Sequence, residues 1–356
     1  MFLLLILASG CQRGPDNSHA SSSLWEILDY YGFTQPDQKR ALAFLMKESG
    51  ALKSNETFQE VFPQREDPSL LFKDILHFVS VTQKYFTIRT GTQERWEIQS
   101  PPWIKEHRPE ILRALRKLGI TEAISPSLHR SDVICILGST FPNMSARLAY
   151  TARLFHAGKL KAKHLVLLAG ERKATISIDG KFEQLLAIAK KYNISDLSHL
   201  TETHLIQEAY YRSRLFNQLP VTVIDTPAGN LPRPTTETTA QAFCQWLKKH
   251  PSWQTVTFIS LQPNVKYQEA ILRGVFKREK VSATFEVIGD KVDLNQTNLH
   301  ALIGALGSQI WAKTPEVIAK VHIKTRDQKL IKAFKELYLK QPLIYKNVEA
   351  LFISGT

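Results

Sequence analysis

Polar and charged residues gather just after several apolar runs of this sequence, at the points where buried parallel strands would end. A Gly-Ser-Thr loop, a Gly-Glu-Arg turn and a Pro-Thr-Thr-Glu-Thr segment follow such runs. Glycine permits close approach of a backbone, and a guanidinium beside the N-terminal amides of a helix favours a phosphate or a carboxylate. We therefore predict an anion-binding site made of Gly138, Ser139, Thr140, Arg147, Gly170, Arg172, Thr235 and Lys266.

Two carboxylates are candidates for proton transfer at this site. Glu237 lies in the Pro-Thr-Thr-Glu-Thr segment, and Glu208 lies in an expected helix before the third apolar run. A carboxylate held in a cleft can have its pKa tuned for acid or base work. Plainer interpretations stay open: the glycine loop turns the chain, Thr235 and Glu237 cap a helix, and Arg147 pairs with a surface carboxylate. The sequence leaves open whether any reaction is catalysed.

Several common enzyme motifs are absent from the sequence. There is no G-x-G-x-x-G fingerprint, no Walker loop and no G-x-S-x-G elbow, which disfavours ordinary dinucleotide binding, P-loop chemistry and an elbow-type serine hydrolase. The 11 histidines show no paired metal-ligand spacing, so no metal site is predicted. These residues do not identify a cofactor.

The elements that must position these residues alternate between short apolar runs and amphipathic helices. Strands are expected at 133–137, 164–169, 221–224, 256–259 and 283–288, and helices at 146–157, 182–192, 203–218, 238–249, 265–277 and 299–312. Strands that are apolar on both faces and separated by helices are typical of a buried parallel sheet with right-handed crossovers. The predicted fold class is α/β, a Rossmann-like parallel sheet of about five strands flanked by helices, with ligands bound at the carboxyl ends of the strands.

The length of 356 residues suits about two domains. Apolar residues at helical spacing predict a small, mostly helical N-terminal domain over 24–125, before the α/β domain of 126–314. The remaining segment, 315–356, is expected to be a basic α/β extension. The net charge of +13 raises nucleic acid or an anionic membrane surface as partners. The lysines of this extension fall on the polar face of an expected helix at 326–341. We therefore interpret them as a solvent-exposed helix face in preference to a nucleic-acid-binding surface.

The N-terminus resembles a bacterial lipoprotein signal. A short apolar stretch ends in small residues directly before Cys11, and a Ser-, Gly- and Pro-rich tether reaches Ser23. We predict lipidation of Cys11 after removal of the signal in segment 1–23, which would anchor the protein in the cell envelope, facing the periplasm. A lipoprotein signal normally begins with basic residues, and none precedes Phe2. Two other interpretations of this segment therefore stay open: a true start site further upstream, and a frayed apolar N-terminus. Cys135 and Cys244 lie in apolar segments and are predicted to be inert core residues.

The first βα units resemble a known family. Asp132 to Gly138, Arg147-Leu-Ala and Leu165 to Gly170 are similar to the YdcF, SanA and ElyC envelope-protein family, in which a strand ends in Leu-Gly and an Arg-initiated helix follows. Glu208-Ala209 resembles that family's Glu-Ala helix, and the segment 235–238 resembles its Thr-x-Glu-Asn motif. The resemblance covers about half of the chain.

The resemblance implies a membrane-associated bacterial protein with a Rossmann-like domain of poorly defined activity. Such proteins are concerned with envelope integrity, or with peptidoglycan-precursor and lipid-carrier metabolism, and some are credited with binding S-adenosylmethionine. This chain departs from the pattern at Thr238, where the family has Asn. It also has Gln262-Pro263 and then Lys266 where the family has Tyr-His followed by Arg. The missing histidine favours binding without turnover, or a different ligand.

The function expected from these observations is that of an envelope protein binding a phosphate-bearing or nucleotide-like small molecule, with Arg147 and the Gly138 loop holding the anion. One alternative is a non-catalytic interaction protein. Another is a binder of anionic polymer or lipid through the basic C-terminus.

Overall fold

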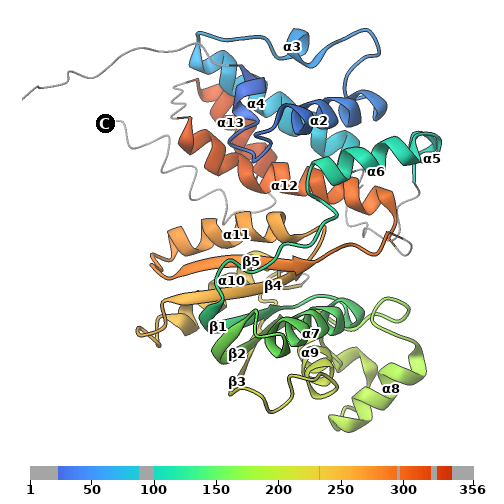
Figure 1. Ribbon diagram of the computed structural model, residues 1–356, viewed down its shortest axis with the longest axis vertical. Coiled ribbons are helices and arrows are strands. Elements are labelled where there is room, and N and C mark those ends of the chain that lie inside the picture. The colour runs from blue at the N-terminus through green and yellow to red at the C-terminus, as the bar shows by residue number, and fades with distance from the viewer. Residues whose placement is uncertain (1–22, 88–99, 232, 295–296, 322–326, 339–356) are drawn as a thin grey trace, which may run out of the picture.

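The computed structural model of the protein describes residues 23–87, 100–231, 233–294, 297–321 and 327–338. Within these residues a five-stranded, all-parallel sheet has helices on both faces (Figure 1). The predicted α/β class with a Rossmann-like sheet is therefore confirmed. Cys11 and the predicted signal lie outside the described residues.

The five strands lie where the apolar runs predicted them, with ends that differ by a few residues. They are β1 (Arg130–Leu137), β2 (Lys161–Gly170), β3 (Val221–Thr226), β4 (Thr255–Leu261) and β5 (Thr284–Asp290). Their order in the sheet is β3-β2-β1-β4-β5. The chain leaves the middle strand in one direction and later returns to its other side, so the switch point lies at the carboxyl ends of β1 and β4, where ligands bind in such sheets.

Alternate side chains of each strand enter two separate apolar cores, because neighbouring residues of a strand point to opposite faces. Ile134 packs with α7 (Phe141–His156) and α9 (Glu202–Tyr211), on the side that also carries α8 (Phe182–Lys191). Cys135 packs with α10 (Thr236–Leu247) and α11 (Val265–Arg278). Cys135 and Cys244 are buried and unbonded, as predicted.

Helices from both ends of the chain form a further layer beside α11 (Figure 1). The N-terminal ones are α1 (Leu24–Ile27), α2 (Pro36–Glu48), α3 (Phe58–Val61), α4 (Pro68–Thr82), the π-helix η1 (Gln83–Thr87), α5 (Pro102–Glu106) and α6 (Arg108–Lys117). The C-terminal ones are α12 (Leu299–Lys320) and α13 (Gln328–Tyr338). Tyr31 and Thr314 share a hydrogen bond of 2.9 Å between side-chain oxygens, and the Phe72 and Phe334 rings lie 5.9 Å apart.

Helix α12 runs through the predicted domain boundary at residue 314. Its expected end lay before Pro315, which has no N–H to donate, yet the helix continues because Val317 and Ile318 add to the buried face. Thr314 donates a hydrogen bond to the Ile310 carbonyl at 2.8 Å, within the same turn. The helical layer is therefore assembled from both ends of the chain. None of the described helices is long and apolar enough to span a membrane.

Candidate functional site

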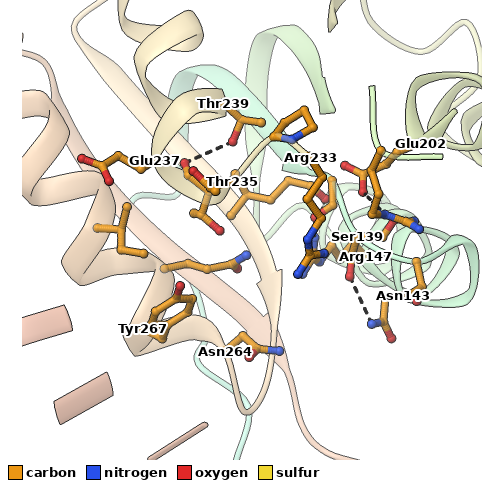
Figure 2. A pocket seen from close by; sticks show the side chains of 18 of the residues that line it. Ser139, Asn143, Arg147, Glu202, Arg233, Thr235, Glu237, Thr239, Asn264 and Tyr267 are labelled. Atoms are coloured by element: carbon orange, nitrogen blue, oxygen red, sulfur yellow. Dashed lines mark hydrogen bonds and ion pairs between the residues drawn. The ribbon is translucent and has the colours of Figure 1, made fainter. Parts of the chain in front are cut away.

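A cavity of about 470 Å³ opens at the carboxyl ends of β1 and β4, where the topology places the switch point. Its wall comes from the loop after β1, from α7 and α9, from the loop before α10, and from the start of α11 (Figure 2). Seven predicted site residues line it: Gly138, Ser139, Thr140, Arg147, Arg172, Thr235 and Glu237.

Arg147 lies at the base of the cavity with only 1% of its surface exposed. Its Nη1 donates hydrogen bonds to the carbonyl oxygens of Leu137 and Gly138, the latter at 2.7 Å. Its Nε makes no hydrogen bond within the described structure. Burial lowers the pKa of Arg147 to about 10, and the nearby Glu202 opposes that shift. At neutral pH the cavity floor therefore carries a guanidinium charge, while the unpartnered Nε is itself buried.

Arg172 is committed to a buried ion-pair network. Its Nε donates to Glu202 at 2.8 Å, and both terminal nitrogens donate to Asp179 at 2.9 Å. Asp179 also accepts the backbone N–H of Phe141 at 2.9 Å, which ties the start of α7 to this network. Burial by itself would lower the pKa of Arg172, but the hydrogen bonds to Asp179 and the charge of Glu202 raise it overall. Arg172 thus positions the cavity wall.

Two glycines allow close contacts that any side chain would block. A Cβ on Gly138 would lie 2.0 Å from Oε1 of Glu202, so the carboxylate occupies the space that this glycine leaves. A Cβ on Gly170 would lie 2.6 Å from Cγ of Pro234, in the loop that forms one wall of the cavity. Gly170 therefore lies behind the wall and determines where the loop before α10 can approach the sheet.

The N-terminus of α7 offers fewer free amides than the sequence indicated. The N–H of Phe141 is used by Asp179, and Pro142 has none. The side-chain amide of Asn143 donates to the Ser139 hydroxyl at 3.2 Å, within the cavity wall (Figure 2). Positive charge in the cavity therefore comes chiefly from arginine side chains.

The loop before α10 brings a third arginine to the cavity. Arg233 is exposed, and Figure 2 shows its side chain reaching toward that of Arg147. Thr235 follows it and caps α10, since its hydroxyl accepts the N–H of Thr238 at 3.3 Å and its own N–H donates to the Thr238 hydroxyl at 2.8 Å. The plainer interpretation of Thr235 as a capping residue therefore holds, although it also lines the cavity.

Glu237 is 4% exposed and lies at the edge of the cavity, turned away from Arg147 and Arg233 (Figure 2). Its Oε1 accepts a hydrogen bond from Arg278 at 2.9 Å. Burial raises the pKa of Glu237 to about 7, because the cost of removing the carboxylate from water exceeds the attraction of Arg278. This carboxyl can exchange a proton at neutral pH.

Besides Gly170, two predicted residues, Glu208 and Lys266, do not line the cavity. Glu208 accepts hydrogen bonds of 2.6 Å from Lys191 and from Arg212, and so joins α8 to α9. Burial would raise the pKa of Glu208, but these two cations lower it. Lys266 lies on the other side of α11, near Gly119, where burial lowers its pKa. Both point away because helical residues that are neighbours in sequence face different directions.

Gln262, at the place where the resemblance expects the family's Tyr-His pair, has a structural role. Its side-chain amide donates to the carbonyl oxygens of Gly119 at 3.2 Å and of Glu122 at 2.8 Å, which fastens the segment entering the α/β region. An amide can make both bonds at once and carries no proton to transfer near neutral pH. In this structure Gln262 therefore serves packing.

Residues of the cavity that the sequence did not reveal are Asn143, Glu202, Arg233, Asn264 and Tyr267. Glu202 is the first residue of α9 and follows the capping residue Thr201, so the sequence marks it only as part of a helix start. Its ion pair with Arg172 joins two segments that are far apart in the sequence, and no local pattern predicts that pair. Across the described residues, no group of three or more His, Cys, Asp or Glu side chains is placed to hold a metal ion.

No protein-family model, no curated protein and no solved structure matches this chain.

Proposed function

We propose that this protein binds a phosphate-bearing or nucleotide-like small molecule in the cavity at the carboxyl ends of β1 and β4. The observation that carries the proposal is the guanidinium of Arg147, a charged group that is 1% exposed and lines this cavity. A buried charge is costly unless a group of opposite charge compensates it, and Glu202, the carboxylate near Arg147, is already paired with Arg172. A phosphate oxygen is such a group.

The charge of the cavity supports an anionic ligand. Three arginines line it, Arg147, Arg172 and Arg233, against the carboxylates Glu202 and Glu237. Glu202 is paired with Arg172, and Glu237 is paired with Arg278, which does not line this cavity. The lining therefore has excess positive charge. Guanidinium groups match phosphate geometry and can donate two parallel hydrogen bonds.

If the protein turns its ligand over by proton transfer, we assign the role of acid or base to Glu237. A pKa of about 7 lies in the range where a carboxyl can work as acid and base at neutral pH. Its pairing with Arg278, and the packing role of Gln262 in place of a histidine, favour a site that binds its ligand without turnover. Glu208 is outside the cavity and is paired with two cations.

Isothermal titration with phenyl phosphate and with adenosine monophosphate tests the proposal. Arg233→Ala should weaken binding at least about tenfold, since a hydrogen bond to a charged group contributes about 1.5–3 kcal/mol. Arg233 is exposed, so this variant should fold normally. Arg214→Ala is the matched control, because it removes the same charge from an exposed residue that does not line the cavity. Equal affinity in the Arg233→Ala and wild-type proteins would contradict the proposal.

We also propose that the protein works at the bacterial cell envelope. The support is the apolar N-terminal stretch ending at Cys11, which lies outside the described residues. Mass spectrometry of the N-terminal peptide from membrane-bound protein should show a diacylglyceryl group on this cysteine. An unmodified Cys11, or a peptide that still begins at Met1, would exclude lipid anchoring of this chain.

A further inference from the structure

A second and larger cavity lies between α11, the start of β5 and the C-terminal half of α12. Its volume is about 1020 Å³, close to the upper limit of the range of roughly 300–1,000 Å³ that is typical of small-molecule sites. Several residues that line it are small, among them Gly274 on α11 and Ala312 and Ala319 on α12, so the two helices leave space between them. The second cavity can therefore enclose an extended molecule.

The inner wall of the second cavity is apolar. Val275 and Phe276 are buried in it, and the ring centroids of Phe276 and Phe285 lie 4.6 Å apart. Val281 and Ala283, in the segment that leads into β5, are only partly buried. Covering apolar surface that is in contact with water lowers the free energy, so this wall suits an apolar molecule.

The charged side chains at the second cavity are mostly cationic. Four cations line it, namely Arg273, Lys277, Arg278 and Lys320. Three of them form ion pairs, namely Arg273 with Glu269, Arg278 with Glu237 and Lys320 with Glu316. Lys277 is exposed and has no ion-pair partner among the described residues. The charge that the lining residues leave unbalanced is therefore the ammonium of Lys277.

The ammonium of Lys277 and the apolar wall together indicate which molecule fits. Glu237 and Glu316, the carboxylates of this wall, already neutralise other cations, whereas the head of an anionic ligand could pair with Lys277. We propose that the second cavity binds a long-chain carboxylate, whose ionised head pairs with Lys277 and whose chain covers the apolar wall. The inference is independent of the proposed function, since it uses neither Arg147 nor Arg233.

Three compounds that share a ten-carbon chain test the inference. Decanoate, decan-1-ol and decyltrimethylammonium are titrated into the full chain at neutral pH, each below the concentration at which it forms micelles. Decanoate should bind most tightly, by up to about fivefold over the alcohol, because an exposed ion pair contributes up to about 1 kcal/mol. Octanoate should bind about fifteenfold more weakly than decanoate, since each buried methylene contributes about 0.8 kcal/mol.

Lys277→Glu tests the head group. The residue is exposed, so the variant should fold normally. It should weaken decanoate binding by about fivefold or more, and should bind decyltrimethylammonium more tightly than decanoate. Lys73→Glu is the matched control, because it makes the same change at an exposed helical lysine that does not line the cavity. Arg233→Ala, which tests the proposed function, should leave the affinity for decanoate unchanged.

Ala319→Trp locates the chain. The residue is partly buried in the wall of the second cavity, so an indole there should occupy the space that the chain needs. We expect this variant to lose most of the affinity for both decanoate and decan-1-ol. Ala187→Trp is the matched control, since this alanine is exposed on α8 and does not line the cavity.

The results that would overturn the inference differ from one another. No binding of any ten-carbon compound, or equal affinity for all three, would mean that the cavity does not recognise a carboxylate. An unchanged order of affinities in Lys277→Glu would place the head group elsewhere. Decanoate binding that is as tight in Ala319→Trp as in the wild-type protein would place the chain elsewhere. Each of these results would leave the proposed phosphate site standing, because that site is tested by Arg233→Ala.

Discussion

Gly138→Ala should destabilise the folded protein by roughly 2.5 to 6 kcal/mol, because the space beside this glycine is already filled. The added Cβ would lie 2.0 Å from Oε1 of Glu202 and 2.9 Å from the carbonyl oxygen of Leu168. Ordinary contacts between such atoms begin near 3.5 Å, so the carboxylate would have to move by more than about an ångström. That movement breaks the 2.8 Å hydrogen bond from Arg172.

The magnitude follows from two contributions. Losing a hydrogen bond between charged groups costs about 1.5–3 kcal/mol. The contact with Leu168 involves a backbone atom inside the sheet, which cannot move aside, and such overpacking costs about 1–3 kcal/mol. Urea-induced unfolding measures the sum as a change in midpoint at constant slope.

A helical glycine provides the matched control. A Cβ on Gly304, within α12, would lie 3.5 Å from the nearest atom, the carbonyl oxygen of Phe86. Gly304→Ala should therefore be neutral or stabilise the protein by up to about 1 kcal/mol, because alanine favours helices. Combining Gly138→Ala with Glu202→Ala should cost less than the sum of the two changes, since both disrupt the same contact. A Gly138→Ala protein within about 1 kcal/mol of wild type would refute the placement of Glu202 over this glycine.

Three further changes should have measurable effects. Asp132→Asn should cost roughly 2 kcal/mol at neutral pH, because hydrogen bonds from Lys163, Gln254 and Thr255 outweigh burial and lower the pKa of Asp132 from 3.8 to about 2. This stability is present above pH 3.8 and is lost as the pH falls through about 2, so the difference between the two proteins in urea unfolding should shrink over that range. Glu237→Gln should flatten the pH dependence of stability between pH 4.5 and about 7, where the wild-type protein loses roughly 3 kcal/mol as its buried carboxyl ionises; equal slopes in the two proteins would contradict the raised pKa. Gly170→Ala should displace Pro234, whose Cγ would lie 2.6 Å from the new Cβ, and thereby misplace Arg233. We expect at least about tenfold weaker binding of phenyl phosphate, and unchanged titration curves would argue against this loop forming the site.

Much of the fold could be predicted because its signal is local. Each strand appeared as a short run that is apolar on both faces; helices on both sides of the sheet bury the apolar runs of β1, β2 and β4, and the edge strands β3 and β5 are buried in part. The positions of Gly138 and Arg147 followed from the same reasoning, since the carboxyl ends of parallel strands meet at one edge. The helix expected at 238–249 begins two residues earlier, at Thr236, after Thr235, which the plainer interpretation took as a cap.

Other predictions depended on contacts that local patterns do not record. The helix expected at 299–312 continues to Lys320, because the partners of α12 in the helical layer stabilise it beyond Pro315. Lys266 follows β4, and Glu208 lies in the helix before β3, so both are near strands in the sequence as the site residues are. Their side chains lie outside the cavity because they are on helix faces that point away from it.

The sequence alone determined the parallel α/β architecture and the edge of the sheet where a ligand can bind, because hydrophobic periodicity and the rules of strand connection are encoded in neighbouring residues. Only the tertiary structure decided which charges are available there. Arg172 is paired with Glu202 across 30 positions, Arg278 with Glu237 across 41, and Arg147 retains an unused donor. Such pairings depend on how the loops close over the sheet, and each exists because burying a charge is costly until an opposite charge meets it.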